Sequence, residues 1–142
     1  MLNIAIINGP NLNLLGTRET DIYGNESFET FLPKLKSRFP NVNISYYQSN
    51  VEGELINQLQ ACNGKVNGIV FNGAGYTHTS VAIADAIAAI KTPVVEVHIS
   101  NIMAREDYRK ISLSAAKCVG SISGLRLDGY ALAIQYFLDT KK

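Results

Sequence analysis

The sequence predicts an α/β fold built on a parallel sheet, and two observations support this prediction. Short apolar runs rich in Val and Ile recur along the chain, and segments whose apolar residues have helical periodicity lie between them. Strands that alternate with helices form parallel sheets with both faces covered. With 142 residues the chain has about the length of one domain, so we expect residues 1–142 to form a single domain.

Five runs have the length and composition of strands. The first, residues 2–7, is apolar and β-branched, and turn-forming residues end it at 8–11. The fourth, residues 94–99, is entered through Pro93. The other three are expected at residues 42–48, 68–71 and 118–123.

Helices are expected between these strands. The first begins at Ser27 and is stopped by Pro40, although Pro33 interrupts its pattern of apolar residues at three- and four-residue spacing. The others are expected at 54–62, 80–90 and 127–138, with a polar, partly helical segment over 101–113. Residues 9–25 show no helix or strand periodicity, and loops of that length are commonly functional or disordered.

This spacing of five strands favours the flavodoxin-like order 2-1-3-4-5, with helices on both faces of the sheet. Ligands of such folds bind beyond the carboxyl ends of the strands, near the point where the strand order reverses. The segments that follow the first, third and fourth strands should therefore converge. The unusual polar residues of the chain lie in these three segments.

Composition excludes several functions. The net charge is only +1, so no general basic surface is available for nucleic acid. No apolar run approaches the ~18 residues of a membrane span, and the first strand lacks the basic lead of a signal peptide. Cys62 and Cys118 lie far apart without His or Cys at metal-ligand spacing, which argues against a disulfide framework or zinc site. We expect a cytoplasmic protein without nucleic acid or membrane partners.

The first loop carries a candidate base. Tyr23 follows Asn11, Asn13, Arg18 and Glu19 in this loop, and glycines at 9, 16 and 24 supply hinges. A phenol acts as a base only when ionised, and with an ordinary pKa near 10 it needs a nearby cation such as Arg18. The alternative is that Tyr23 packs on the core while Arg18 is solvated.

The loop after the third strand suits a hydroxylated or anionic ligand. It offers Asn72, His78 and backbone amides at the expected helix start. His78 stands where a dinucleotide fingerprint starting at Gly73 would need a glycine, so a nucleotide cofactor is disfavoured. The alternative is a turn in which Thr79 or Ser80 caps the helix and His78 is merely exposed.

Glu96 and His98 lie two residues apart on the fourth strand and therefore share a face of the sheet. A carboxylate can orient the imidazole and favour its protonated form, which makes His98 a candidate general acid. A purely structural pair is the alternative. Arg105 and Arg109, four residues apart, could clamp a carboxylate or form a solvated charged surface.

Other chemistries are disfavoured. No Gly-rich loop precedes Lys-Ser or Lys-Thr, and the stretch GSISG at 120–124 misplaces the serine of a nucleophile elbow by one residue. The two histidines are 20 residues apart, and no carboxylates can be paired with them as metal ligands. We therefore expect neither a metal nor a cofactor.

Three motifs together identify a family. They are NGPNLNLLGTRE at 8–19 continuing to IYG at 22–24, YTHTSVA at 76–82, and EVHISN at 96–101 continuing to ARED at 104–107. In order and spacing the chain resembles a type II 3-dehydroquinate dehydratase over essentially its whole length. The resemblance implies cofactor-free, reversible dehydration of 3-dehydroquinate to 3-dehydroshikimate in the shikimate pathway or in quinate catabolism.

The resemblance also assigns roles. Tyr23 would accept the proton from C2 with Arg18 activating it, Asn11 would hold a water on the enolate, and His98, oriented by Glu96, would protonate the departing hydroxyl. The implied substrate-binding residues are Asn72, His78, Asp85, Ile99, Ser100 and Arg109. Asp85, a surface residue of the Ala-rich helix, would enter a neighbouring subunit's site in a homododecamer built as a tetramer of trimers.

Two positions depart from the family pattern. Gly73 and Thr20 stand where prolines are common, which should loosen the substrate loop and the lid. Two other functions stay open. A flavodoxin-like binding module would keep the fold without turnover, and the Schiff-base type of dehydratase, which has an unrelated fold, would need a buried reactive lysine, whereas Lys65 and Lys91 lie at expected helix ends.

Overall fold

The structure is a computed structural model, and it describes residues 1–17 and 19–141. Five parallel strands form one sheet in the order β2-β1-β3-β4-β5, which confirms the predicted order. The strands are β1 Leu2–Asn8, β2 Val42–Gln48, β3 Gly68–Asn72, β4 Val94–His98 and β5 Gly120–Ser123. The helices are α1 Thr20–Tyr23, α2 Phe28–Arg38, α3 Glu52–Cys62, α4 Val81–Ala89 and α5 Asp128–Thr140.

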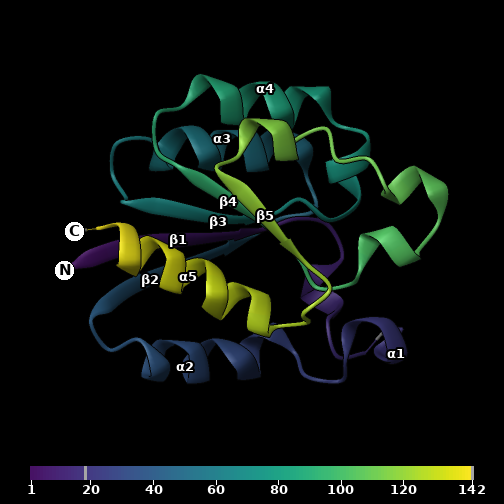
Figure 1. Cartoon of the computed structure of the whole chain (residues 1–142), viewed down its shortest axis with the longest axis horizontal. Helices are drawn as coiled ribbons and strands as arrows, with labels where there is room; N and C mark the ends of the chain where they lie inside the picture. The colour runs from purple at the N-terminus through teal and green to yellow at the C-terminus, as the bar shows by residue number, and fades with distance from the viewer. Residues whose placement is uncertain (18, 142) are drawn as a thin grey trace.

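Helices cover both faces of the sheet, as expected. In Figure 1, α2 and α5 lie against one face, and α3 and α4 lie against the other. Side chains alternate along a strand, so β1 serves two cores: Ile4 and Ile6 pack on the α2/α5 side, while Ala5 and Ile7 pack on the α3/α4 side. Within the described residues no helix is both long and apolar enough to cross a bilayer.

The α2 helix shows how local sequence sets an element. Ser27 caps it by accepting a hydrogen bond from the backbone N–H of Thr30. Phe28 and Leu35 are buried in the core, as the periodicity predicts. Pro33 lies inside the helix, so burial of the apolar stripe outweighs the hydrogen bond that proline cannot donate.

Short turns connect the strand ends to the helices. Residues 9–25, which show no helix periodicity in the sequence, contain two short helical segments: η1, a 3-10 helix (label η), spans Leu12–Leu14, and α1 spans Thr20–Tyr23. Both are too short to produce a sequence periodicity. Four further single-turn elements follow strands, namely η2 Ala74–His78, η3 Ile102–Ala104, η4 Asp107–Arg109 and η5 Ala115–Lys117.

The loops after β1 and β3 touch through their backbones. The N–H of Gly9 donates to the carbonyl of Asn72 at 2.7 Å. A Cβ on Gly9 would lie 2.7 Å from the carbonyl oxygen of Gly73, a distance that no side chain can relieve. Only glycine therefore fits at position 9.

The loop after β3 contains a strained residue. Ala74 has a φ of +51°, in the left-handed region that costs a residue with a Cβ about 1–2 kcal/mol. Gly73, in contrast, has a φ of −76°, which suits a proline, but a Cβ there would lie 2.9 Å from the Phe71 ring. Replacing Gly73 by proline would therefore force the Phe71 ring to shift, whatever it does to loop mobility.

Replacing Ala74 by glycine should stabilise the protein. The change removes left-handed strain at the loss of a partly buried methyl group, and we expect a net gain of about 1 kcal/mol in the free energy of unfolding. Urea unfolding of the variant measures this gain. Gly75→Ala is the matched control, since a Cβ at Gly75 meets nothing within 4 Å. A lower midpoint for Ala74→Gly would contradict the assignment of strain.

Candidate active site

A cleft of about 100 Å³ opens at the carboxyl ends of β1, β3 and β4. This is the edge of the sheet where the sequence predicted that polar segments converge. Of the candidate site residues named from the sequence, nine line the cleft: Asn11, Tyr23, Asn72, His78, His98, Ile99, Ser100, Arg105 and Arg109. Glu96 lies behind His98, and Asp85 is exposed on α4 and does not line the cleft.

Tyr23, at the end of α1, meets an arginine in the cleft. The Nη1 group of Arg105 donates to the phenolic oxygen at 2.6 Å and to Oγ of Ser100 at 3.2 Å. The guanidinium carbon also lies 5.3 Å from the centre of the tyrosine ring. These contacts place a positive charge against the phenolic oxygen, while the ring packs on the α2/α5 core.

A solvated surface is the wrong interpretation for Arg105 and Arg109. Their side chains are 11% and 22% exposed, because η3 and η4 fold back over the cleft. The contact of Arg105 with Tyr23 was not predicted, since the two residues are 82 positions apart and neither spacing nor composition connects them. The predicted pairing of Tyr23 with Arg18 lies outside the described residues.

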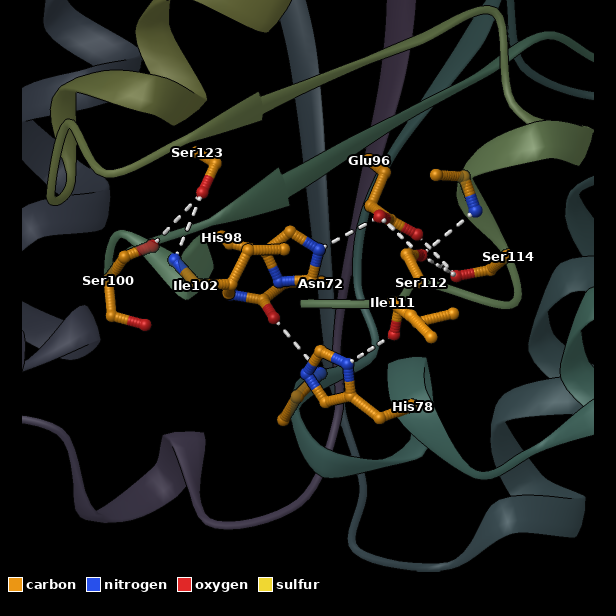
Figure 2. Close-up of polar contacts among 12 residues, drawn as sticks. Asn72, His78, Glu96, His98, Ser100, Ile102, Ile111, Ser112, Ser114 and Ser123 are labelled. Carbon is orange, nitrogen blue, oxygen red and sulfur yellow. Dashed lines mark hydrogen bonds and ion pairs between the residues drawn. The ribbon is translucent and has the colours of Figure 1, made fainter. Parts of the chain in front are cut away.

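His98 and Glu96 form the predicted pair. Figure 2 shows Nε2 of His98 against Oε2 of Glu96, at 2.8 Å, and the Glu96 residue is 1% exposed. Because a carboxylate oxygen only accepts, Nε2 carries a hydrogen. In residues 1–17 and 19–141, Nδ1 makes no hydrogen bond, and His98 lines the cleft. This leaves Nδ1 as the ring nitrogen for a ligand.

Glu96 is held as an anion despite its burial. Burial alone raises the pKa of a carboxyl group, but the hydrogen bond and charge of His98, with hydrogen bonds from Ser114 and Ser112, lower the pKa of Glu96 below 4.5. Ser112 donates to Oε2 at 2.9 Å, and Ser114 donates to Oε1. Sequence reasoning missed both serines, because nothing in their spacing connects them to β4.

His78 reaches the cleft from η2. Its Nδ1 donates to the carbonyl of Ile111 at 2.8 Å, and its ring lies 6.3 Å from that of His98 at an angle of 25°. Ser80 caps α4 by accepting from the N–H of Ile83, so the capping expectation is also correct. His78 is half-buried and lines the cleft, rather than standing exposed outside it.

A buried tyrosine positions the two asparagines that end β1 and β3. The hydroxyl of Tyr130, on α5, donates to Oδ1 of Asn8 at 2.8 Å and accepts from Nδ2 of Asn72 at 3.0 Å. Asn8 and Asn72 end β1 and β3 and are paired in register. Burial raises the pKa of Tyr130, so its hydroxyl stays protonated and able to donate. The side chain of Asn72 is fixed further by accepting from the N–H of Ala74 at 3.0 Å.

Removing the Tyr130 hydroxyl should destabilise the protein. In Tyr130→Phe the buried amides of Asn8 and Asn72 each lose a partner, and we expect the free energy of unfolding to fall by about 2–4 kcal/mol. Urea unfolding measures the loss. The control is Tyr136→Phe on the same helix, whose side chain is 40% exposed. Equal free energies of unfolding for the two variants would contradict a stabilising role of the buried Tyr130 hydroxyl.

Two further residues shape the rim of the cleft. Asn11 has a φ of +69°, and its N–H donates to Oδ1 of Asn50 at 3.0 Å. Arg109 donates from Nε to Oε2 of Glu106 at 2.8 Å, and Tyr108 donates to the same oxygen. These hydrogen bonds from Tyr108 and Arg109 lower the pKa of Glu106 to about 2, so it stays ionised beside Arg109.

Metal binding, thiol chemistry and Schiff-base formation lack a suitable arrangement of side chains among the described residues. In the part of the chain that the structure describes, no three His, Cys, Asp or Glu residues are grouped to hold a metal ion. Cys62 and Cys118 are both free, and burial raises the pKa of Cys118 to about 12, with Glu96 adding to the effect. Lys65 and Lys91 are exposed, which does not suit a Schiff-base nucleophile.

Comparison with known proteins gives consistent matches. The family model described as "Dehydroquinase class II" matches residues 2–138. The 3-dehydroquinate dehydratase of Fusobacterium nucleatum is 49% identical, with 97% of each chain covered, and that of Clostridium botulinum is 50% identical, covering 98% of this chain and 96% of its own. The type II dehydroquinase of Butyrivibrio crossotus superposes with a TM-score of 0.93 at 42% identity, covering 96% of this chain and 97% of its own.

Proposed function

The chain belongs to the dehydroquinase class II family of hydro-lyases, as its motifs predicted, and on that premise we propose that it dehydrates 3-dehydroquinate to 3-dehydroshikimate by acid and base catalysis at this cleft. One observation carries the proposal. Tyr23 and His98 line the same cleft, and each has the partner that its role requires: Arg105 on the phenolic oxygen and Glu96 on the imidazole.

The first step is proton abstraction. Tyr23, as the phenolate, takes the proton from C2, and the electron pair of that C–H bond moves onto the C3 carbonyl oxygen to form an enolate. Arg105 supports this role because its guanidinium already contacts the phenolic oxygen at 2.6 Å. Arg18 shares the role by resemblance. A water held by Asn11 stabilises the enolate oxygen.

The second step expels water. The enolate electrons form the C1–C2 double bond, and the C1 hydroxyl leaves with a proton from His98. Because Nε2 is occupied by Glu96, Nδ1 delivers that proton. The proton gained by Tyr23 and the proton lost by His98 balance, so both groups are reset by one proton transfer and neither metal nor cofactor is required.

The remaining cleft residues bind substrate. Arg109 would bind the substrate carboxylate, and its position in the cleft lining together with the capacity of a guanidinium to bind carboxylates supports this role. Asn72, His78, Ser100 and the backbone at Ile99 supply hydrogen bonds to the hydroxyl groups. The loop carrying Tyr23 closes over the ligand, with Gly16 and Gly24, both at positive φ, as hinges.

Asp85 can contribute to this type of site only from a neighbouring subunit. It is exposed on α4 and does not line the cleft of its own chain, so it would act in a neighbouring subunit of a homododecamer formed as a tetramer of trimers. We place the enzyme in the cytoplasm, where it would serve the shikimate pathway for aromatic amino acids.

The test is turnover of 3-dehydroquinate by the purified protein in the presence of a chelator, followed by the ultraviolet absorbance of the conjugated product. We expect turnover that neither chelator nor borohydride with substrate abolishes. Loss with borohydride would indicate an imine on a lysine instead. A folded protein without turnover would favour a binding module.

A further inference from the structure

The segment 111–114 forms hydrogen bonds with two site residues, His78 and Glu96. The carbonyl of Ile111 accepts from His78, and the hydroxyls of Ser112 and Ser114 both donate to Glu96, as Figure 2 shows. The N–H of Leu113 also donates to the carbonyl of Thr77 at 2.9 Å, which ties the segment to η2. One short stretch between η4 and η5 therefore contacts the parts of the site that lie behind both histidines.

The two serines are oriented as donors. The hydroxyl of Ser112 accepts from the N–H of Ala115 at 3.0 Å and donates to Oε2 of Glu96 at 2.9 Å, because a carboxylate oxygen only accepts; its oxygen also lies 3.3 Å from Oγ of Ser114. Ser114 is 1% exposed and donates to Oε1. With Nε2 of His98 on Oε2, both carboxylate oxygens have donors, which is the arrangement that stabilises a buried anion.

The location of the proton shared by His98 and Glu96 depends on the hydroxyls of Ser112 and Ser114. When the imidazole is charged, Nε2 and Nδ1 both carry hydrogens, and Glu96 is a carboxylate. If the carboxylate were less stabilised, the Nε2 proton would pass to Glu96. The neutral ring would then hold only its Nδ1 hydrogen and would be a far weaker acid. A buried pair tolerates either form, so its hydrogen-bond donors decide which is populated.

We propose that Ser112 and Ser114 are positioning residues that keep the shared proton on His98 rather than on Glu96, and thereby keep His98 able to act as the acid. The inference rests on the proposed function for its catalytic meaning, but the proton location can be measured without substrate. Within the described residues neither serine lines the cleft, so both act through Glu96.

Other ionisable groups surround the pair and stay unchanged in the test. They are His78 from η2, Tyr23 from α1, Arg105 and Arg109 from the segment after β4, and Cys118 after η5. Ser→Ala changes remove no charge, so any change in the imidazole reports the lost hydroxyl groups.

The experiment is nitrogen-15 NMR of the imidazole rings in the full-length protein. The chain contains two histidines, and a His78→Asn variant assigns the remaining signals to His98. With the shared proton on the ring, Nε2 of His98 should have the shift of an imidazolium in the wild type. In Ser112→Ala, Ser114→Ala and the double variant it should move toward that of a neutral ring.

Turnover provides the second readout. Each alanine variant should lose kcat by about 10-fold, because a hydrogen bond to a charged group is lost, with KM unchanged. Ser112→Thr retains the hydroxyl and should restore both the imidazolium shift and kcat. Ser121→Ala is the matched control: Ser121 is exposed on β5, and its backbone pairs with Glu96 while its side chain makes no bond to it.

Two results would overturn the proposal. One is a folded Ser112→Ala variant in which His98 keeps the wild-type imidazolium shift. This result would count whatever the kcat of the variant, since a drop in kcat alone would indicate a structural role. The other is failure of Ser112→Thr to restore the shift. If Ser114→Ala does not fold, the half-buried Ser112 decides the question alone. A wild type without dehydratase turnover would refute the proposed function, while the NMR shifts would still test the proton location.

Discussion

Tyr23→Phe should reduce kcat for 3-dehydroquinate by between about 10² and 10⁴-fold, the usual contribution of a general base. The phenolic oxygen is the atom that Arg105 contacts, and it is the only part of the side chain that the change removes. The ring keeps its packing on the α2/α5 core, so the fold should be retained. Product absorbance under saturating substrate measures the loss, and circular dichroism measures the fold.

Tyr136→Phe is the matched control for this change. It removes a phenolic oxygen from an exposed position on α5, and its kcat should equal that of the wild type. Persistent turnover in Tyr23→Phe would remove Tyr23 from the role of base. An Arg105→Lys variant tests whether the geometry of the arginine contact, and not only its charge, supports Tyr23. A lysine keeps the positive charge but has no planar group that can span both Tyr23 and Ser100.

Glu96→Ala should lower the free energy of unfolding by about 3–5 kcal/mol near neutral pH, the usual effect of breaking a buried ion pair. The change removes the buried carboxylate that accepts hydrogen bonds from His98, Ser112 and Ser114. It should also abolish most turnover, because His98 loses the carboxylate that orients it. Urea unfolding measures the first effect, with Glu29→Ala on the exposed face of α2 as control.

The difference in the free energy of unfolding between the wild type and Glu96→Ala should become smaller as the pH falls. The pKa of Glu96 is lowered in the folded protein, so its ionised form contributes stability that is complete above the unfolded value of about 4.5. That contribution is lost as pH falls through the lower folded value. The gap between the two proteins should therefore narrow below about pH 4.5. A gap that stays constant down to acid unfolding would contradict an ionised Glu96.

The parts of the fold and site that depend on local pattern were predictable. Strand alternation places Glu96 and His98 on one face, and the structure joins them at 2.8 Å. The β-branched runs located all five strands, although β5 begins at Gly120 rather than Cys118, because this edge strand is largely exposed and its pattern is weak. The α3 helix starts two residues earlier than predicted, at Glu52.

The parts that depend on distant segments were not predictable. Arg105 reaches Tyr23 because η3 folds back over the cleft, and Tyr130 reaches Asn8 across 122 positions. Ser112 and Ser114 lie in a segment without periodicity, so no spacing rule connects them to β4. Such contacts follow from the assembled tertiary structure, whereas each sequence motif describes one strand end at a time.

The glycine at position 9 limits how this site could be redesigned. Because the backbone after β1 lies directly on the backbone after β3, residue 9 has no space for a side chain. A library that randomised residue 9 while keeping the loop after β3 would mostly sample chains in which the two loops clash. Grafting a new specificity onto this sheet therefore requires either that glycine be kept at this contact or that both loops be exchanged together.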